Sequence, residues 1–108
     1  MTDLARAAIR AILTRLVAEY SPQKVILFGS HAEGTADRDS DIDLLIVKET
    51  SETFLDRWVT VRRILTGTHR SIPLDTLVLT PQELEERLAI GDQFIAGILK
   101  EGEVLYVA

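Results

Sequence analysis

The chain has 108 residues and no cysteine, so disulfides and thiolate metal sites are excluded. Its formal net charge of −5 disfavours contact with a phosphate backbone, and we expect no direct nucleic-acid partner. The sequence has neither the run of about 20 apolar residues that crosses a bilayer nor the apolar stretch of a signal peptide. We therefore expect a single domain over residues 1–108, no membrane association, and the cytoplasm as the default compartment.

The first half of the chain combines one helical pattern with two apolar strands. In chain order, the predicted elements are a helix over 3–20, a strand over 24–28, a polar loop over 35–41 and a strand over 41–47. Thr2 or Asp3 is placed to cap the helix, and Pro22 prevents its continuation. The first strand ends at Gly29, where the chain must turn.

The second half alternates helices with strands. Its predicted elements are a helix over 51–66, a strand over 74–79, a helical pattern over 80–99 with a break at Gly91, and a strand over 103–107. Ser51 is expected to cap the first of these helices, with Phe54, Trp58, Val61 and Leu65 on one stripe. Thr80 and Glu83 have the spacing of a capping box. The element order predicts an α+β fold with a small mixed sheet flanked by helices.

Three aspartates are candidates for binding metal ions. Asp41 and Asp43 are two residues apart at the start of a strand, so their side chains should share one face, with Cα atoms roughly 6.6 Å apart. Asp75 stands near the start of an apolar strand, where propensity and desolvation both disfavour a carboxylate. If these strands are neighbours, the three acids converge, and a divalent cation such as Mg²⁺ is the natural counter-charge.

A Gly-Ser turn precedes the acids. Gly29 lets a phosphate approach the backbone, and Ser30 offers a hydroxyl and an N–H at the start of a short helical turn. The turn lacks the Gly-Lys-Ser/Thr of a Walker A loop. Each part alone has an ordinary explanation: a tight turn, a strand cap, or an edge residue. The ordered combination favours a site for a metal-bound nucleotide.

These residues carry a resemblance to a known superfamily. Gly29-Ser30, ten variable residues and Asp41-Ile42-Asp43 match the pattern of the nucleotidyltransferases related to DNA polymerase beta. Residues 29–34 also contain the longer form Gly-Ser-x-Ala-x-Gly, and Asp75 stands where the family carries its third carboxylate. The chain resembles the minimal nucleotidyltransferase branch over most of its length.

The resemblance implies transfer of a nucleoside monophosphate, usually AMP from ATP, to an acceptor hydroxyl. Asp41 and Asp43 would hold two Mg²⁺ ions, and Asp75 would help to hold one of them and act as general base or orient the acceptor. Gly29 and Ser30 would bind the terminal phosphates.

The resemblance also implies a partner. Minimal members of the branch resemble antitoxins encoded beside a HEPN-type ribonuclease toxin, which they adenylylate on a tyrosine. A HEPN-type toxin is therefore the expected partner, and a homo- or hetero-oligomer stays open. Two alternatives remain: an antitoxin that neutralises its partner by binding without catalysis, and nucleotidyl transfer to a small molecule.

The chain departs from the family pattern in the turn. Many relatives carry basic residues where His31 and Glu33 stand here. Glu33 cannot assist a phosphate, so Arg38, Lys48 or the partner is expected to supply positive charge. For His31, contact with a phosphate is one alternative, and a solvent-facing position in the turn is the expected one. His69, Trp58 and Tyr106 are expected to be structural, in a loop, a helix core and a strand respectively.

Overall fold

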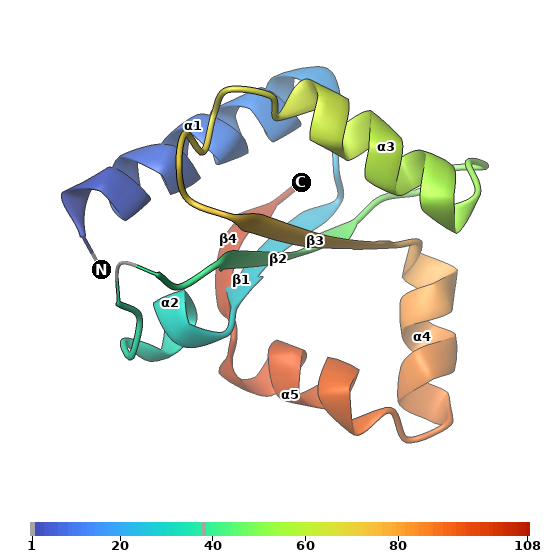
Figure 1. The fold of residues 1–108 in the computed structure, drawn as a ribbon. Coiled ribbons are helices and arrows are strands. Elements are labelled where there is room, and N and C mark those ends of the chain that lie inside the picture. The colour runs from blue at the N-terminus through green and yellow to red at the C-terminus, as the bar shows by residue number, and fades with distance from the viewer. Residues whose placement is uncertain (1, 38) are drawn as a thin grey trace.

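A computed structural model describes residues 2–37 and 39–108 (Figure 1). Its elements, in chain order, are α1 (Asp3–Glu19), β1 (Lys24–Phe28), α2 (Ser30–Glu33), β2 (Ile42–Val47), α3 (Phe54–Ile64), β3 (Leu74–Leu79), α4 (Pro81–Ala89), α5 (Gln93–Glu101) and β4 (Glu103–Val107). The predicted order of helices and strands is confirmed. No helix within these two ranges has the length and apolar character required to pass through a lipid bilayer.

The four strands form one mixed sheet in the order β3-β2-β1-β4. β1 pairs antiparallel with β2 and with β4, whereas β2 and β3 are parallel. The parallel pair is joined by α3, the crossover connection that such a pair requires. This arrangement places β2, which follows the Gly-Ser turn, between β1 and β3.

Helices cover both faces of the sheet (Figure 1). α1 and α3 lie on one face, where Leu16, Leu44 and Val61 belong to the larger apolar cluster. α4 and α5 lie on the other face, where Ile26, Leu45 and Ile95 belong to a smaller cluster. Because both faces are covered, β2 has five buried residues out of six and reads as an almost continuous apolar run.

Side-chain caps set the helix starts. Thr2 caps α1 and Thr80 caps α4 with a complete capping box, both as predicted. α3 begins at Phe54 with Thr53 as its cap, so the prediction of Ser51 was wrong. The predicted break at Gly91 is confirmed: Gly91 has a φ of 80°, and Asp92 caps a new helix, α5.

The buried side of α3 differs from the predicted stripe. Trp58 and Phe54 are 42% and 53% exposed, so the predicted helix-core position of Trp58 was wrong. Trp58 instead packs against the Arg62 guanidinium, 5.0 Å from the ring centre. Arg57 takes the inward position and donates to the Glu52 and Val78 carbonyl oxygens. Apolar periodicity could not foresee this, because the pattern assigns an arginine to solvent.

An ion pair joins α3 to α4, and its loss should lower stability. Arg57 Nη1 lies 2.6 Å from Glu83 Oε1, and the Arg57 side chain is only 7% exposed. Glu83→Ala leaves the buried Arg57 guanidinium without its carboxylate partner and removes the capping box. We therefore expect the free energy of unfolding to fall by about 2–3 kcal/mol. Urea denaturation followed by circular dichroism measures the loss. Glu85→Ala, an exposed change in the same helix, should cost less than about 0.5 kcal/mol; equal losses would refute the role of the ion pair.

Candidate active site

Asp43 and Asp75 lie directly opposite each other on neighbouring parallel strands. Residues paired in this way are about 4.8 Å apart and point to the same face of a sheet. Leu45 and Leu79 share that face by the two-residue alternation, and they pack against α5 in the smaller cluster. The two carboxylates therefore lie on the α4–α5 side of the sheet. The strand adjacency on which their convergence depended is confirmed.

Gly29 makes room for the Asp43 carboxylate. A Cβ on Gly29 would lie 2.3 Å from Asp43 Oδ2, so any other residue at this position would force the carboxylate to move. The φ of 75° and ψ of −156° at Gly29 also belong to a region that is essentially restricted to glycine. The Gly-Ser turn and Asp43 are thus packed together, although 12 residues lie between Ser30 and Asp43 in the chain.

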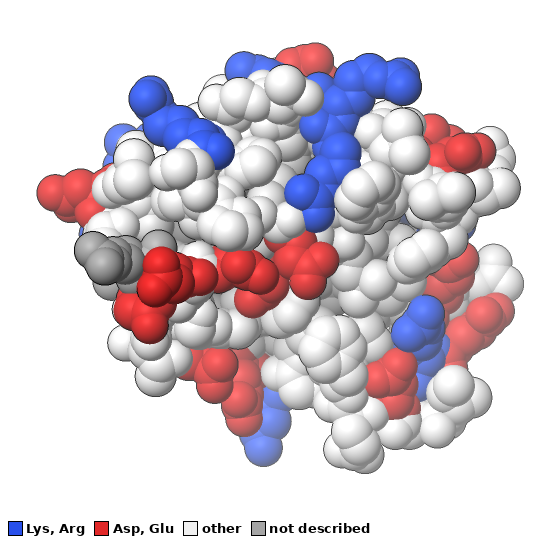
Figure 2. Space-filling model, viewed as in Figure 1, with Lys and Arg blue, Asp and Glu red and all other residues white. Residues whose placement is uncertain are grey.

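Among the described residues, no lysine or arginine lowers the pKa of Asp43. Partial burial raises the pKa of Asp43, and the charges of Asp75 and Asp41 raise it further, whereas His31 acts in the opposite direction. In Figure 2, acidic side chains form a row that runs from the left side to the centre of the molecule. A carboxylate group in such a field is stabilised by a bound cation.

The donor set fits a magnesium ion. Among the described residues, no three acidic or histidine side chains already form a complete ligand cluster. Mg²⁺ does not require one, because it is usually held by one or two carboxylates, with water and substrate phosphates completing the octahedron. The Asp43–Asp75 pair, open to solvent on the Asp75 side, supplies ligands of this kind.

Asp41 stands just outside the strand. β2 begins at Ile42, so the prediction that the strand starts at Asp41 was off by one residue. The Ile42 N–H donates to the Pro73 carbonyl oxygen, which ties the start of β2 to the start of β3. Asp41 itself is exposed, and its charge acts on Asp43. It is therefore placed at the rim of the site rather than on the packed face.

Ser30 begins the short helix α2. Gly29 is its N-terminal cap, and the carbonyl oxygen of Gly29 accepts from the N–H groups of Ala32 and Glu33. Gly34 ends the helix with a φ of 78°, so the predicted helical turn from Ser30 to Gly34 is confirmed. The first N–H groups of a helix have no partner within it, which leaves the Gly-Ser turn able to donate to an anion.

Comparison with known proteins decides the family. A sequence model described as nucleotidyltransferase domain matches residues 9–107. The chain belongs to this nucleotidyltransferase family. A candidate protein adenylyltransferase of Methanocaldococcus jannaschii is 30% identical over 101 residues, which are 92% of this chain and 95% of that relative. The chain is thus a nucleotidyltransferase, as its motif predicted.

Solved structures share the fold of this nucleotidyltransferase. A toxin-antitoxin crystal structure with AMP-PNP superposes with a TM-score of 0.65 and 21% identity, over 92% of this chain and 73% of that one. A candidate minimal nucleotidyltransferase superposes with a TM-score of 0.60 and 27% identity, over 94% of both chains. The predicted α+β fold is confirmed.

His31 is buried, against the prediction that it faces solvent. Only 7% of it is exposed, and its Nε2 lies 3.3 Å from the Ser40 carbonyl oxygen. The imidazole thereby connects the nucleotidyltransferase turn to the residue before Asp41. The sequence contained no signal for this contact, because the loop that brings Ser40 back to α2 has no apolar pattern. His31 is a supporting residue that sequence reasoning missed.

Lys48, one of the expected sources of positive charge, does not lie at the site. Lys48 follows the last residue of β2, five positions from Asp43, and so lies about 16 Å from the acids. Its Nζ donates to the Ser21 carbonyl oxygen and lies over the Tyr20 ring. Lys48 therefore cannot neutralise a phosphate at the turn, and that prediction was wrong. Arg38, the other candidate, lies outside the described residues.

The raised pKa of Asp43 predicts a pH-dependent stability difference. A carboxyl with a raised folded-state pKa favours the folded state when protonated, and this advantage is lost as pH rises through that pKa. Asp43→Asn mimics the protonated group. With divalent cations chelated, we expect this variant to melt at a higher temperature than the wild type at pH 7.5.

The same measurement contains its own checks. The difference in melting temperature should narrow as pH is lowered through the raised pKa of Asp43, because the wild-type carboxyl then becomes protonated as well. Addition of Mg²⁺ should raise the melting temperature of the wild type more than that of Asp43→Asn. Equal melting temperatures of the two proteins at pH 7.5 would show that the charge of Asp43 does not destabilise the folded state.

Proposed function

We propose that this nucleotidyltransferase moves AMP from ATP to a hydroxyl of a protein partner, a tyrosine of a HEPN-type toxin, and thereby acts as an antitoxin. The observation that carries the proposal is the close approach of Gly29 to Asp43, which stands opposite Asp75 on the neighbouring strand. The Gly-Ser turn suits phosphate oxygens, and the two carboxylates suit the cations that accompany a triphosphate. Their contact gives a triphosphate and its counter-ions one shared location.

The residues divide the work of an in-line transfer. The acceptor oxygen forms a bond to the α-phosphorus, the bond from that phosphorus to the bridging oxygen breaks, and pyrophosphate leaves. Ser30 and the backbone at Gly29 bind the departing phosphates. Asp75 orients the acceptor hydroxyl and takes its proton. Asp41 and Asp43, with Asp75, would hold two Mg²⁺ ions, which when bound supply charge for the phosphoryl oxygens and the leaving group.

The comparisons support the choice of substrates. The relative from Methanocaldococcus jannaschii is named for protein adenylyl transfer, and it matches this chain over nearly the full length of both. A structural neighbour is a toxin-antitoxin that holds an ATP analogue. Both features agree with an ATP-dependent enzyme whose acceptor is a protein.

A second function is neutralisation by binding alone. The outer side of α3 exposes four large apolar residues, namely Phe54, Leu55, Trp58 and Val59, at 39–67% of their surface. Apolar side chains gathered on one exposed helix suit contact with another protein. A partner held there could be inhibited without any covalent change.

Mass spectrometry separates the two functions. We would incubate the protein with ATP, Mg²⁺ and the product of the adjacent gene, and then measure the mass of that product. Transfer predicts an increment of one or more AMP units with wild-type protein and none with Asp41→Ala or Asp43→Ala. Neutralisation that persists in these variants, with no added mass, would refute catalysis and support binding alone.

A further inference from the structure

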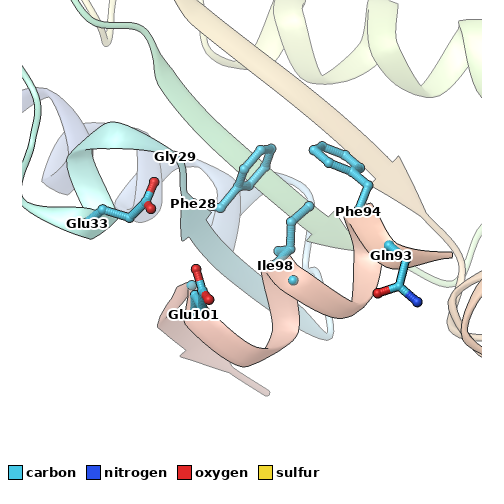
Figure 3. Close-up of a pocket in the computed structure, with 9 residues that line it drawn as sticks. Phe28, Gly29, Glu33, Gln93, Phe94, Ile98 and Glu101 are labelled. Atoms are coloured by element: carbon cyan, nitrogen blue, oxygen red, sulfur yellow. The ribbon is translucent and has the colours of Figure 1, made fainter.

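Two phenylalanines stand over the acid pair. Phe28 ends β1 and is paired with Asp43, and Phe94 lies in the first turn of α5. Their rings meet edge to face, with centroids 5.8 Å apart and planes at 85° (Figure 3). Phe94 is nevertheless 59% exposed. Exposure of one apolar residue is ordinary; what distinguishes Phe94 is that its exposed ring borders the same hollow as Asp43 and Asp75.

Phe28 and Phe94 border two hollows. One, of about 310 Å³, reaches the turn at Gly29 and carries the carboxylates of Glu33 and Glu101 (Figure 3). The other, of about 360 Å³, is bounded by Asp43 and Asp75, and Leu77 adds to its apolar wall. The second hollow joins the acids directly to an aromatic surface.

The proposed reaction determines what must enter the second hollow. The α-phosphorus lies at Asp43 and Asp75, and the departing phosphates lie at the Gly29-Ser30 turn. The ribose is bonded to that same phosphorus, so the nucleoside must occupy space that borders the acids. The hollow at Asp43, Asp75 and Phe94 is such a space, and its apolar wall suits the face of a base.

We propose that Phe94 is a nucleotide-binding residue on which the base of the donor nucleotide stacks, with Phe28 supporting the ring from β1. This inference rests on the proposed function, because it takes the position of the phosphates from it. Stacking uses the π-face that every base has, so Phe94 contributes affinity and does not choose between bases.

Calorimetric titration with two ligands tests the proposal without any acceptor. The ligands are Mg-ATP and magnesium tripolyphosphate, which has the phosphates but no base. In wild-type protein we expect Mg-ATP to bind more tightly. Phe94→Ala should weaken Mg-ATP binding by about tenfold and leave tripolyphosphate binding unchanged. Phe94→Trp should retain the affinity for Mg-ATP, because it restores an aromatic face.

Ile90→Ala provides a matched control, since Ile90 is an 81% exposed apolar residue in the turn before α5. It should change neither affinity. If Phe94→Ala weakens both ligands equally, or neither, the stacking role is refuted. If the wild type binds neither ligand, the proposed nucleotide transfer itself fails, and this result is distinct from a failure of stacking.

Discussion

Asp43→Asn is expected to reduce AMP transfer by at least about 10³-fold. The amide keeps the shape of the side chain but removes the charge that would hold a cation between the two strands. Asp43 is the acid that contacts the Gly29 turn and faces Asp75 in register, so no neighbouring carboxylate can take its place. Transfer of label from α-³²P-ATP to the partner protein measures the loss.

The direction of the stability change makes this prediction specific. A variant that is inactive because it unfolds would melt at a lower temperature, whereas Asp43→Asn should be inactive and yet more stable without cations. Glu49→Gln, an exposed change in the loop after β2, should leave both transfer and melting unaltered. Near-normal transfer by Asp43→Asn would rule out a metal-holding role for Asp43.

Gly29→Ala should lose both stability and nucleotide binding. The backbone at Gly29 lies in a glycine-only region, where another residue costs about 1–3 kcal/mol. The added methyl group would also overlap Asp43 Oδ2, so the carboxylate must move away from the turn. We expect the free energy of unfolding to fall by about 3 kcal/mol and Mg-ATP binding to become undetectable by calorimetry.

Gly34→Ala separates the effect of backbone strain from the effect of the overlap with Asp43. Gly34 has a similar φ of 78°, but a Cβ there meets nothing within 4 Å. This variant should lose about 1–2 kcal/mol from the left-handed backbone alone and should still bind Mg-ATP. If the two variants bind Mg-ATP equally well, the close approach of Gly29 to Asp43 has no functional role.

Local signals in the sequence predicted most of the elements, because they depend on neighbours in the chain. The capping box at Thr80 and Glu83 is an example, since each side chain bonds the other's backbone within one turn. The inward side of α3 could not be predicted in this way. Arg57 turns inward because it donates hydrogen bonds to the Glu83 carboxylate and to the Val78 carbonyl oxygen. These acceptors are 26 and 21 residues further along the chain.

For the site, the sequence by itself determined the residue types and their order: the Gly-Ser turn, the two aspartates of the motif, and Asp75. It could do so because that pattern belongs to one family. Only the tertiary structure decided how they meet, because strand pairing joins positions that are distant in the chain. In the folded chain, Asp75 lies opposite Asp43, and Asp43 lies close to Gly29. His31 is buried near the Ser40 carbonyl oxygen, and Lys48 lies at the other end of β2 from the site.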